Sequence, residues 1–295
     1  MAIAECNMIV DSTQRELVQH GSAAFPIACY HDDLSKYEVP WHWHEEWEAG
    51  IILEGTGLFA AGKEKFVLHP GEGFFANSQV LHGCWDLENS GSKYHSIVFH
   101  PRLVGGSLDS VFYQNYLQPL LANHALEGLH LSPEISWQRK FLENIEAAWQ
   151  ACAGEAFGYE FQVRSALSEL MLLLQQNIPD SRKPPSTKQQ RDAERIKAML
   201  QYIHDHCADE LNTKIIAQAA AVSESECLRC FRSTIGTTPI QYVRQHRIQK
   251  AVQLLTTTEL PVSVISEQCG FQDVSYFTKT FREMKGCAPT AFRRK

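Results

Sequence analysis

The chain has 295 residues, of which 44% are hydrophobic, 10% aromatic and 21% charged, with a net charge of −7. This composition excludes a wholly disordered protein, and no apolar run approaches the ~20 residues that a membrane-spanning helix needs. The charge is unevenly distributed: residues 1–181 carry nine Lys and Arg against 23 Asp and Glu, whereas residues 182–295 carry 18 against 11. Net charges of −14 and +7 predict two modules, the second with an anionic partner such as nucleic acid.

The N-terminus and the cysteines predict the compartment. Residues 1–10 include Glu5 and lack both the basic and the long apolar segments of a signal peptide. The nine cysteines are odd in number and widely scattered, which favours reduced thiols over a disulfide framework. We therefore expect a cytoplasmic protein with no membrane partner.

Residues 25–101 are predicted to form β-structure, and helices follow. Short apolar runs such as 50–53 and 73–76 are separated by turns rich in glycine and proline, which is typical of a sandwich or barrel. After residue 108 two apolar stripes have helical spacing, and they comprise Phe141, Ile145, Ala148 and Trp149, then Val163, Leu167, Leu170, Met171 and Leu174. The second stripe fits a helix packed on the barrel and equally a helix that joins two subunits, and spacing alone does not choose.

Residues 177–190 contain Pro184 and Pro185 and resemble an exposed linker. Beyond them, residues 215–235 have the form of a helix-turn-helix, in which Ser223 and Glu226 are spaced as a capping box. A similar pattern recurs about fifty residues later, near 264–281, and a long amphipathic helix joins the two. Two such patterns at this spacing are much stronger evidence for helix-turn-helix motifs than one pattern would be.

This region resembles the DNA-binding domain of the AraC/XylS family of transcription regulators over about residues 195–294. The positions that carry the resemblance are Val222–Ser225, Phe231, Arg232, Gly236, Pro239, Tyr242, Arg247, Ile248, Ala251, Leu254, Leu255, Gly270, Phe271, Asp273, Ser275–Phe277, Phe281, Arg282, Gly286 and Pro289. Thr213, Ser266 and Cys269 depart from the family pattern outside the recognition helices. The resemblance implies two recognition helices that enter successive major grooves about 34 Å apart.

The outward positions of the two recognition helices are the predicted DNA contacts. Arg229 and Lys279 suit the O6 and N7 atoms of guanine, and Leu228 suits a thymine methyl group. The remaining contacts are expected to hold phosphates, and they are Ser225, Arg232, Ser275, Thr278 and Arg282. The alternative for each cation is an ordinary solvated surface charge.

Cys227 and Cys230 form the only C-x-x-C pattern of the chain. A zinc site needs four ligands, and no second pair lies at suitable spacing. We therefore expect both thiols to be buried as small hydrophobic side chains.

The strongest pattern upstream is residues 40–48, PWHWHEEWE. Alternate residues of a strand share one face, so we expect His42, His44 and Glu48 to point together and the three tryptophans of this segment to point away. The spacing is similar to the first cupin motif, and His82 lies where the second motif supplies a histidine. Many AraC/XylS members carry such a jelly-roll domain as an effector sensor, so the resemblance extends to this half.

His42, His44, Glu48 and His82 are therefore the polar candidates for an effector site. The same four side chains could hold a divalent metal ion such as Fe, Mn, Ni or Zn; the alternative is that they are inherited barrel-lining residues without metal. The aromatic candidates for the effector pocket are Phe59, Phe75 and Trp85, and the alternative for each is a residue of the plain hydrophobic core.

Together these patterns predict an α+β multidomain protein with an N-terminal jelly-roll (cupin) barrel plus helices and a C-terminal all-α double helix-turn-helix. We expect an effector-binding barrel in 1–107, a helical dimerisation and relay segment in 108–178, a linker in 179–192 and a DNA-binding domain in 193–295. The predicted function is a one-component regulator that binds promoter DNA as a homodimer in response to a small effector, with RNA polymerase as a partner if it activates. The alternatives are a metal-dependent cupin enzyme, such as a dioxygenase or isomerase, joined to a DNA-binding domain, and a barrel with a purely structural role.

Overall fold

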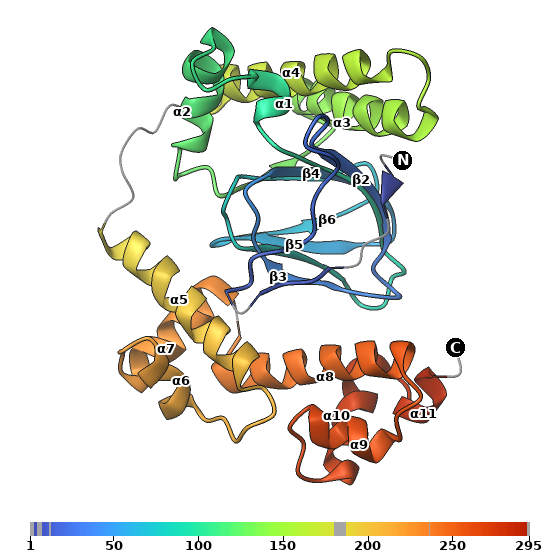
Figure 1. Cartoon of the computed structure of the whole chain (residues 1–295), viewed down its shortest axis with the longest axis vertical. Coiled ribbons are helices and arrows are strands. Elements are labelled where there is room, and N and C mark those ends of the chain that lie inside the picture. Colours follow the sequence, from blue (N-terminus) through green and yellow to red (C-terminus); the bar gives the residue numbers. More distant parts are fainter. Residues whose placement is uncertain (1–2, 5–7, 12, 180–186, 236, 294–295) are drawn as a thin grey trace. The chain divides into compact units, whose positions relative to one another are not determined.

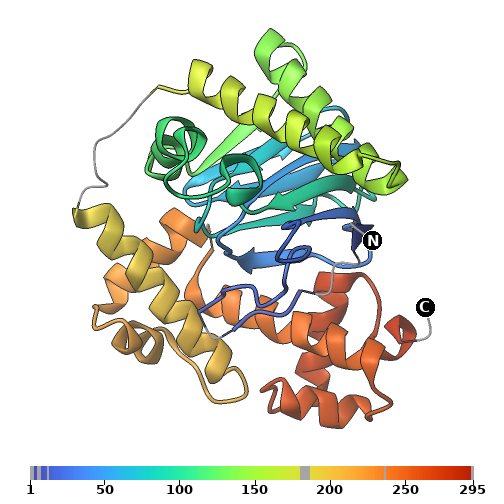
Figure 2. The same cartoon turned by 45° about the horizontal axis from the view of Figure 1, so that its top comes forward.

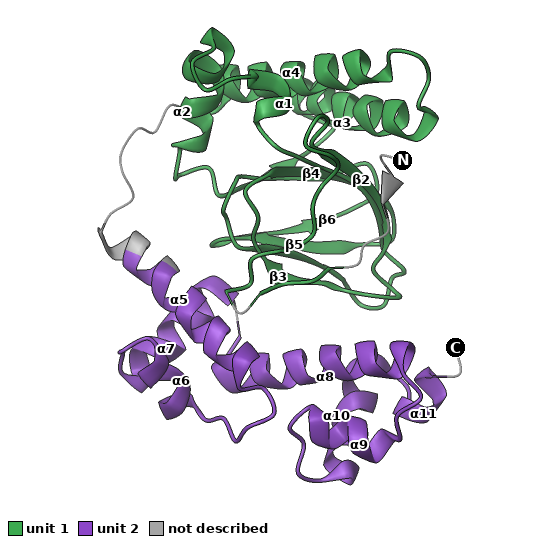
Figure 3. Ribbon diagram, viewed as in Figure 1, with its two compact units in different colours: residues 1–187 green, residues 188–295 purple. Residues whose placement is uncertain are grey.

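The structure is a computed structural model that describes residues 3–4, 8–11, 13–179, 187–235 and 237–293. It divides into two compact units, residues 1–187 and 188–295 (Figure 3). The first unit is a β-sandwich with helices and the second is helical, so the predicted α+β fold class is confirmed. Pro184, Pro185 and Gly236, which entered the predictions, lie outside the described residues. Among the helices that the structure describes, none is long and apolar enough to cross a membrane.

Two sheets form the sandwich (Figure 1). In spatial order, the six-stranded sheet contains β1 (Ile3–Ala4), β2 (Ile27–Asp33), β9 (Lys93–Phe99), β4 (Trp47–Glu54), β7 (Gly73–Ala76) and β10 (Gly128–Leu131). The four-stranded sheet contains β3 (Val39–His42), β8 (His82–Asp86), β5 (Gly57–Ala61) and β6 (Glu64–Leu68). The pairs are antiparallel except for β1 with β2.

Side-chain alternation along the strands separates two hydrophobic cores. On β7, Phe74 points between the sheets, where its ring stacks on Phe59 with centroids 4.0 Å apart. Its neighbour Phe75 points to the opposite face, where its ring lies 6.1 Å from that of Phe141. Apolar side chains therefore cover both faces of the six-stranded sheet, and helices bury the outer face.

The helices α3 (Ser136–Gly154) and α4 (Tyr159–Asn177) lie side by side over that outer face (Figures 1 and 2). Trp149 of α3 donates its indole N–H to the carbonyl oxygen of Tyr30 in β2 at 2.9 Å. The second predicted apolar stripe is at most 2% exposed and packs within its own unit; it comprises Val163, Leu167, Leu170, Met171 and Leu174. This burial favours the interpretation of α4 as a helix packed on the sandwich.

Residues 100–135 complete the first unit with α1 (Arg102–Gly105), the π-helical turn η1 (Tyr113–Leu117), α2 (Gln118–Leu121) and β10. β10 pairs with β7, so the sandwich extends beyond residue 107 into the segment that we predicted as helical. The amide of Asn77 fixes the preceding loop by donating to the carbonyl oxygens of Leu120 and Leu126 at 3.1 and 3.0 Å.

The second unit consists of the helices α5 (Thr187–Asp205), α6 (Thr213–Ala219), α7 (Glu224–Cys230), η2 (Phe231–Ile235), α8 (Pro239–Thr257), α9 (Val262–Gln268), α10 (Val274–Lys285) and α11 (Pro289–Phe292). α6 and α7 form one helix-turn-helix, α9 and α10 form the other, and the 19-residue α8 connects them. Residues 187–192, which we predicted as the end of the linker, are part of α5.

A side-chain cap starts the second helix of each motif. The Ser223 hydroxyl accepts a hydrogen bond from the Glu226 amide at 3.3 Å, and the Asp273 carboxylate accepts one from the Tyr276 amide at 2.7 Å. Both bonds satisfy amides that have no partner within the helix. Gly270 makes the turn before α10 with φ +78°, a conformation that favours glycine.

Candidate ligand site and candidate DNA-binding surface

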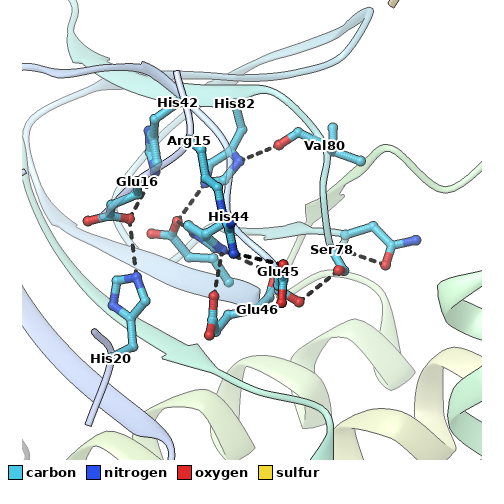
Figure 4. A network of polar contacts seen from close by, with 12 residues as sticks. Arg15, Glu16, His20, His42, His44, Glu45, Glu46, Ser78, Val80 and His82 are labelled. Carbon is cyan, nitrogen blue, oxygen red and sulfur yellow. Dashed lines mark hydrogen bonds and ion pairs between the residues drawn. The ribbon is translucent and has the colours of Figure 1, made fainter. Parts of the chain in front are cut away.

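Four predicted side chains meet in the interior of the sandwich (Figure 4). His42, His44, Glu48 and His82 are each at most 5% exposed, and one potential ligand atom from each lies within 4.8 Å of the others. The ring centroids of His42 and His82 are 4.2 Å apart, and those of His44 and His82 are 4.8 Å apart. We call these four residues the histidine cluster.

The cluster does not arise from the alternation of side chains along one strand, which was the basis of the prediction. β3 ends at His42 in the four-stranded sheet, and after the turn 43–46 the chain enters the six-stranded sheet as β4. His42 pairs with His82 across β3 and β8, beyond an irregularity in register. The side chains of His42 and Glu48 therefore converge because each points inward from its own sheet, and the prediction of a single continuous strand was wrong.

Backbone carbonyl groups fix the orientation of the three imidazoles. The Nδ1 atoms of His42 and His82 lie 2.9 and 2.8 Å from the carbonyl oxygens of Pro40 and Val80. The Nδ1 atom of His44 lies 3.2 Å from the carbonyl oxygen of Glu46. Because a carbonyl oxygen only accepts, each Nδ1 must carry the proton, and in the neutral ring each Nε2 carries a lone pair.

The Nε2 atoms face the carboxylate of Glu48. His82 Nε2 lies 3.0 Å from Glu48 Oε2, and His44 Nε2 lies 3.7 Å from the same oxygen. Burial raises the pKa of Glu48, but hydrogen bonds and charge from His44 and His82 outweigh it and hold that pKa well below its ordinary value. Burial lowers the pKa of His42 to about 3 and also lowers that of His44. The cluster thus combines the carboxylate of Glu48 with two imidazoles, those of His42 and His44, whose burial favours the neutral form.

A second pair of ionisable residues beside the cluster was missed in the sequence. Glu16 and His20 come from the N-terminal segment, and the Glu16 amide donates to the carbonyl oxygen of Trp43 at 2.9 Å. His20 Nε2 lies 3.1 Å from Glu16 Oε2, and the His20 ring centroid is 5.2 Å from that of His44. Their spacing of four residues is the only local signal, and the pairing with Trp43 is a long-range contact that local patterns do not reveal.

Of the three predicted aromatic residues, Phe59 lies beside the cluster, with its ring centroid 6.4 Å from that of His82. Phe59 lies between the sheets but belongs to the apolar stack with Phe74, and Phe75 points away toward Phe141. Trp85 follows the inward-facing Cys84, and its ring lies 5.3 Å from that of Trp41. Phe75 is thus a residue of the plain core, as its alternative held, and Trp85 lies on the outer side of its sheet, so neither lines the interior as an effector contact would.

The free volume near the cluster is small. A cavity of about 20 Å³ is lined by Glu16, His20, Asp32, His42 and Glu48, among others. A larger cavity of about 450 Å³ lies elsewhere in the unit and is lined by residues that include Phe25, Arg102, Phe161 and Arg164. The histidine cluster and the larger cavity therefore lie in different parts of the first unit.

On the first predicted recognition helix, Ser225 and Arg232 are exposed and Leu228 is half-buried. Cys227 and Cys230 are fully buried, as expected of core residues. The apolar side of α7 is thus fixed in the core, and the opposite side carries the predicted phosphate contacts.

Arg229 takes part in an ion-pair network. Its Nη2 atom lies 2.7 Å from both Asp192 Oδ1 and Glu226 Oε1, and its Nε donates to Glu226 Oε2 at 2.9 Å. Arg195 binds the same Glu226 at 2.8 Å. These hydrogen bonds raise the pKa of Arg229 and engage its Nε and Nη2, so guanine would compete with the two carboxylates for these donors.

On α10, Ser275, Lys279 and Arg282 are exposed, and Thr278 is half-buried. Lys279 Nζ is 4.0 Å from Glu283 Oε1, and both side chains are largely exposed, so this pair constrains the lysine little.

Tyr276 was not predicted as a DNA contact, although its side chain is 44% exposed. The guanidinium carbon of Arg244 lies 5.9 Å from its ring centroid. The only signal in the sequence was the outward position of Tyr276 between Ser275 and the buried Phe277.

Comparison with known proteins agrees with both halves. Residues 25–171 match the AraC-like ligand binding domain family, and residues 216–295 match a helix-turn-helix domain family. The HTH-type transcriptional regulator YdeC of Bacillus subtilis is 30% identical over 98% of each chain. The arabinose operon regulatory protein of Salmonella typhimurium is 28% identical over 82% of each chain. The transcriptional activator RhaS of Escherichia coli is 24% identical over 88% of this chain and 89% of its own.

These relatives are regulators rather than enzymes, so the alternative of a cupin enzyme is set aside. The histidine cluster lies in the part of the chain that matches the ligand-binding family, and the two capped helices α7 and α10 lie in the part that matches the helix-turn-helix family. The chain belongs to the AraC family of DNA-binding transcription regulators, a non-enzymatic family, and combines an AraC-like ligand-binding domain with a helix-turn-helix domain.

Proposed function

We propose that this regulator binds promoter DNA sequence-specifically through α7 and α10, and that a small ligand at the histidine cluster controls that binding. The observation that carries the proposal is the pair of helix-turn-helix motifs joined by α8, each with a capped second helix whose outer side is polar. The net charge of +7 on residues 182–295 supports binding to a polyanion.

The exposed cations supply the non-specific part of the affinity. Arg232 follows α7, while Lys279 and Arg282 lie on α10. Each phosphate contact releases counterions, so removing one should weaken binding for every sequence and reduce the salt slope by about 1. The Lys279 side chain is largely exposed and only weakly paired with Glu283, so it can also reach a base edge in the major groove.

The test is a selection of bound fragments from a random DNA library with the full chain, followed by fluorescence anisotropy at several salt concentrations. We expect a site with two half-sites about one helical turn apart. Arg282→Ala should weaken binding and lower the salt slope, whereas Lys140→Ala on α3, an exposed cation of the first unit, should change neither. Failure to enrich any sequence, or equal behaviour of the two variants, would contradict the proposal.

Arg229 provides a separate test of base recognition. In the free protein Asp192 and Glu226 hold its guanidinium, and a guanine that binds the same donors competes with these ion pairs. Asp192→Asn removes one competing carboxylate, so it should strengthen binding to the selected site, and Arg229→Ala should relax the preference for one base pair. An unchanged base preference in Arg229→Ala would remove Arg229 from the set of base-reading residues.

We further propose that the regulator acts as a homodimer and, where it activates, contacts RNA polymerase. Apolar side chains on the outer side of the first unit support dimerisation: Phe161 and Leu172 of α4 are 79% and 38% exposed, and Phe112 is 57% exposed. Sedimentation of the wild type and of Phe161→Glu tests this, since a dimer that uses α4 should become a monomer. A wild type that stays monomeric on selected DNA contradicts the proposal, and transcription in vitro from the selected site tests the polymerase contact.

A further inference from the structure

We infer that the ligand of the sandwich is a divalent transition-metal ion, held by the Nε2 atoms of His42, His44 and His82 and by the carboxylate of Glu48. The inference deepens the proposed function, on which its regulatory part rests, because it names the chemical class of the ligand. It is carried by the hydrogen bonds around the cluster and by the free volume next to it.

The first step is the mismatch of donors and acceptors. All three Nδ1 atoms are engaged by backbone carbonyl oxygens, so the three Nε2 atoms present lone pairs. The fourth group of the cluster is a carboxylate, which also only accepts. Four acceptors thus face one another at a site that is almost entirely buried. Such an arrangement requires a positive species at its centre, either a proton or a cation.

A proton satisfies only part of the cluster. Placed on His82 Nε2, it would make one good hydrogen bond to Glu48 at 3.0 Å. His44 Nε2 would remain buried without a hydrogen-bond partner within the described part of the chain, as it is now, with the Glu48 oxygen 3.7 Å away. A cation at the centre accepts electron pairs from all four groups at once.

Backbone carbonyls that hold the far nitrogen of a ligating histidine are the usual support of a metal site, because they fix the tautomer and the direction of the ring. An isolated ion pair with Glu48 would require only one histidine, whereas here backbone carbonyls orient three of them around the carboxylate. Four atoms bound tetrahedrally to one ion at ~2.1 Å lie ~3.4 Å apart, so the four ligand atoms, now within 4.8 Å of one another, need to approach by at most ~1.4 Å.

Free volume and donor chemistry limit the class of ligand. The adjoining cavity of about 20 Å³ holds one species the size of water, whereas drug-sized and cofactor sites occupy about 300–1,000 Å³. Three nitrogen donors exclude Ca²⁺ and Mg²⁺, which favour oxygen ligands, and favour first-row ions such as Fe²⁺, Co²⁺, Ni²⁺ and Zn²⁺. The ion would act as a structural and regulatory ligand of the sandwich.

The binding experiment uses the full chain without a histidine tag, treated with chelator and titrated with Co²⁺. We expect one equivalent of Co²⁺ to bind, with visible d–d absorption. Zn²⁺ and Ni²⁺ should compete with Co²⁺ for the same site. His82→Gln and Glu48→Gln should each lose more than ~100-fold in affinity, since even outer-shell partners of metal sites contribute 10–100-fold. His124→Gln, which removes an exposed histidine of the same unit, should bind as the wild type does.

The wild-type spectrum keeps the inference testable if a cluster variant fails to fold. Absence of d–d absorption and of stoichiometric uptake in the wild type overturns the site. Uptake that His82→Gln and Glu48→Gln leave unchanged also overturns it, because the ion then binds elsewhere.

The regulatory part is tested with the DNA that the wild type selects. Anisotropy of that DNA is measured with metal-free protein and after one equivalent of Zn²⁺, and we expect at least a fivefold change in affinity that Glu48→Gln abolishes. Metal uptake without any change in DNA affinity overturns the ion as the controlling ligand. Failure of both metal-free and metal-loaded protein to select any DNA from the library overturns the proposed function, and the Co²⁺ titration then still decides the metal site.

Discussion

Lowering the pH from 8 to 5 should destabilise the helical unit by about 2 kcal/mol, because at pH 5 the unfolded chain binds protons on a histidine pair that the folded unit keeps neutral and half-buried. His204 of α5 and His246 of α8 have ring centroids 3.7 Å apart. Burial and the charge of Lys250 lower the pKa of His204 from its ordinary 6.5 to about 4. Burial and the charges of His204, Lys250 and Arg247 lower the pKa of His246 well below its ordinary value.

The sign follows from proton linkage. The unfolded chain takes up a proton on His204 near pH 6.5, whereas the folded unit keeps this ring neutral down to about pH 4. Stability from the neutral ring is therefore complete above pH 6.5 and falls as the pH drops toward 4. At pH 5, one and a half pH units below 6.5 at about 1.4 kcal/mol per unit give a loss of about 2 kcal/mol from His204 alone.

The assay is urea unfolding of the full chain at pH 8 and pH 5. All six tryptophans lie between residues 41 and 149, so tryptophan fluorescence reports unfolding of the first unit. A loss of helical ellipticity that is not accompanied by a change in fluorescence reports unfolding of the second unit. His204→Gln should lose about 2 kcal/mol of the pH dependence, and His206→Gln, an exposed neighbour paired with Asp209, should keep it. Equal pH dependence in His204→Gln and wild type would refute the reasoning.

Substitutions at three positions test which contacts stabilise the second helix-turn-helix. Gly270→Ala should destabilise the helical unit by more than ~2 kcal/mol, because its φ is +78° and the added Cβ would lie 2.5 Å from the carbonyl oxygen of Cys207; an unchanged unfolding midpoint contradicts this. Asp273→Ala should cost about 1 kcal/mol by removing the cap on the Tyr276 amide, and Asp273→Asn should restore most of it. Phe281→Ala should cost about 3–5 kcal/mol, since the ring is fully buried; a loss below ~1 kcal/mol would show that the core closes over the cavity.

The helical half could be predicted in detail because its signals are local. The cap at Ser223 and the burial of Cys227 and Cys230 both follow from spacing within one or two turns. The ion pairs of Arg229 are different, because Asp192 lies 37 residues away in another helix. An outward position in a helix is predictable from the sequence, but the partner that a long cation finds there is not.

In the sandwich, the residues of the cluster could be predicted but their surroundings could not. Phe75 and Phe74 are adjacent, and either could face the interior, since helices cover the other side and make both faces apolar. The same ambiguity placed Trp85 wrongly. The transfer of the chain between sheets after His42 follows no periodic pattern, and it alone explains how Glu48 meets His82.

The transfer between sheets also has a thermodynamic consequence. His42 and His82 belong to the four-stranded sheet and Glu48 to the six-stranded sheet. Any species that binds all three therefore connects the two sheets of the sandwich. By mass action, a ligand present at 100 times its Kd adds about 2.7 kcal/mol to the unit that holds it and nothing to a unit that does not. The melting temperature of the sandwich should therefore rise with ligand concentration while that of the helical unit stays constant, and tryptophan fluorescence distinguishes the two.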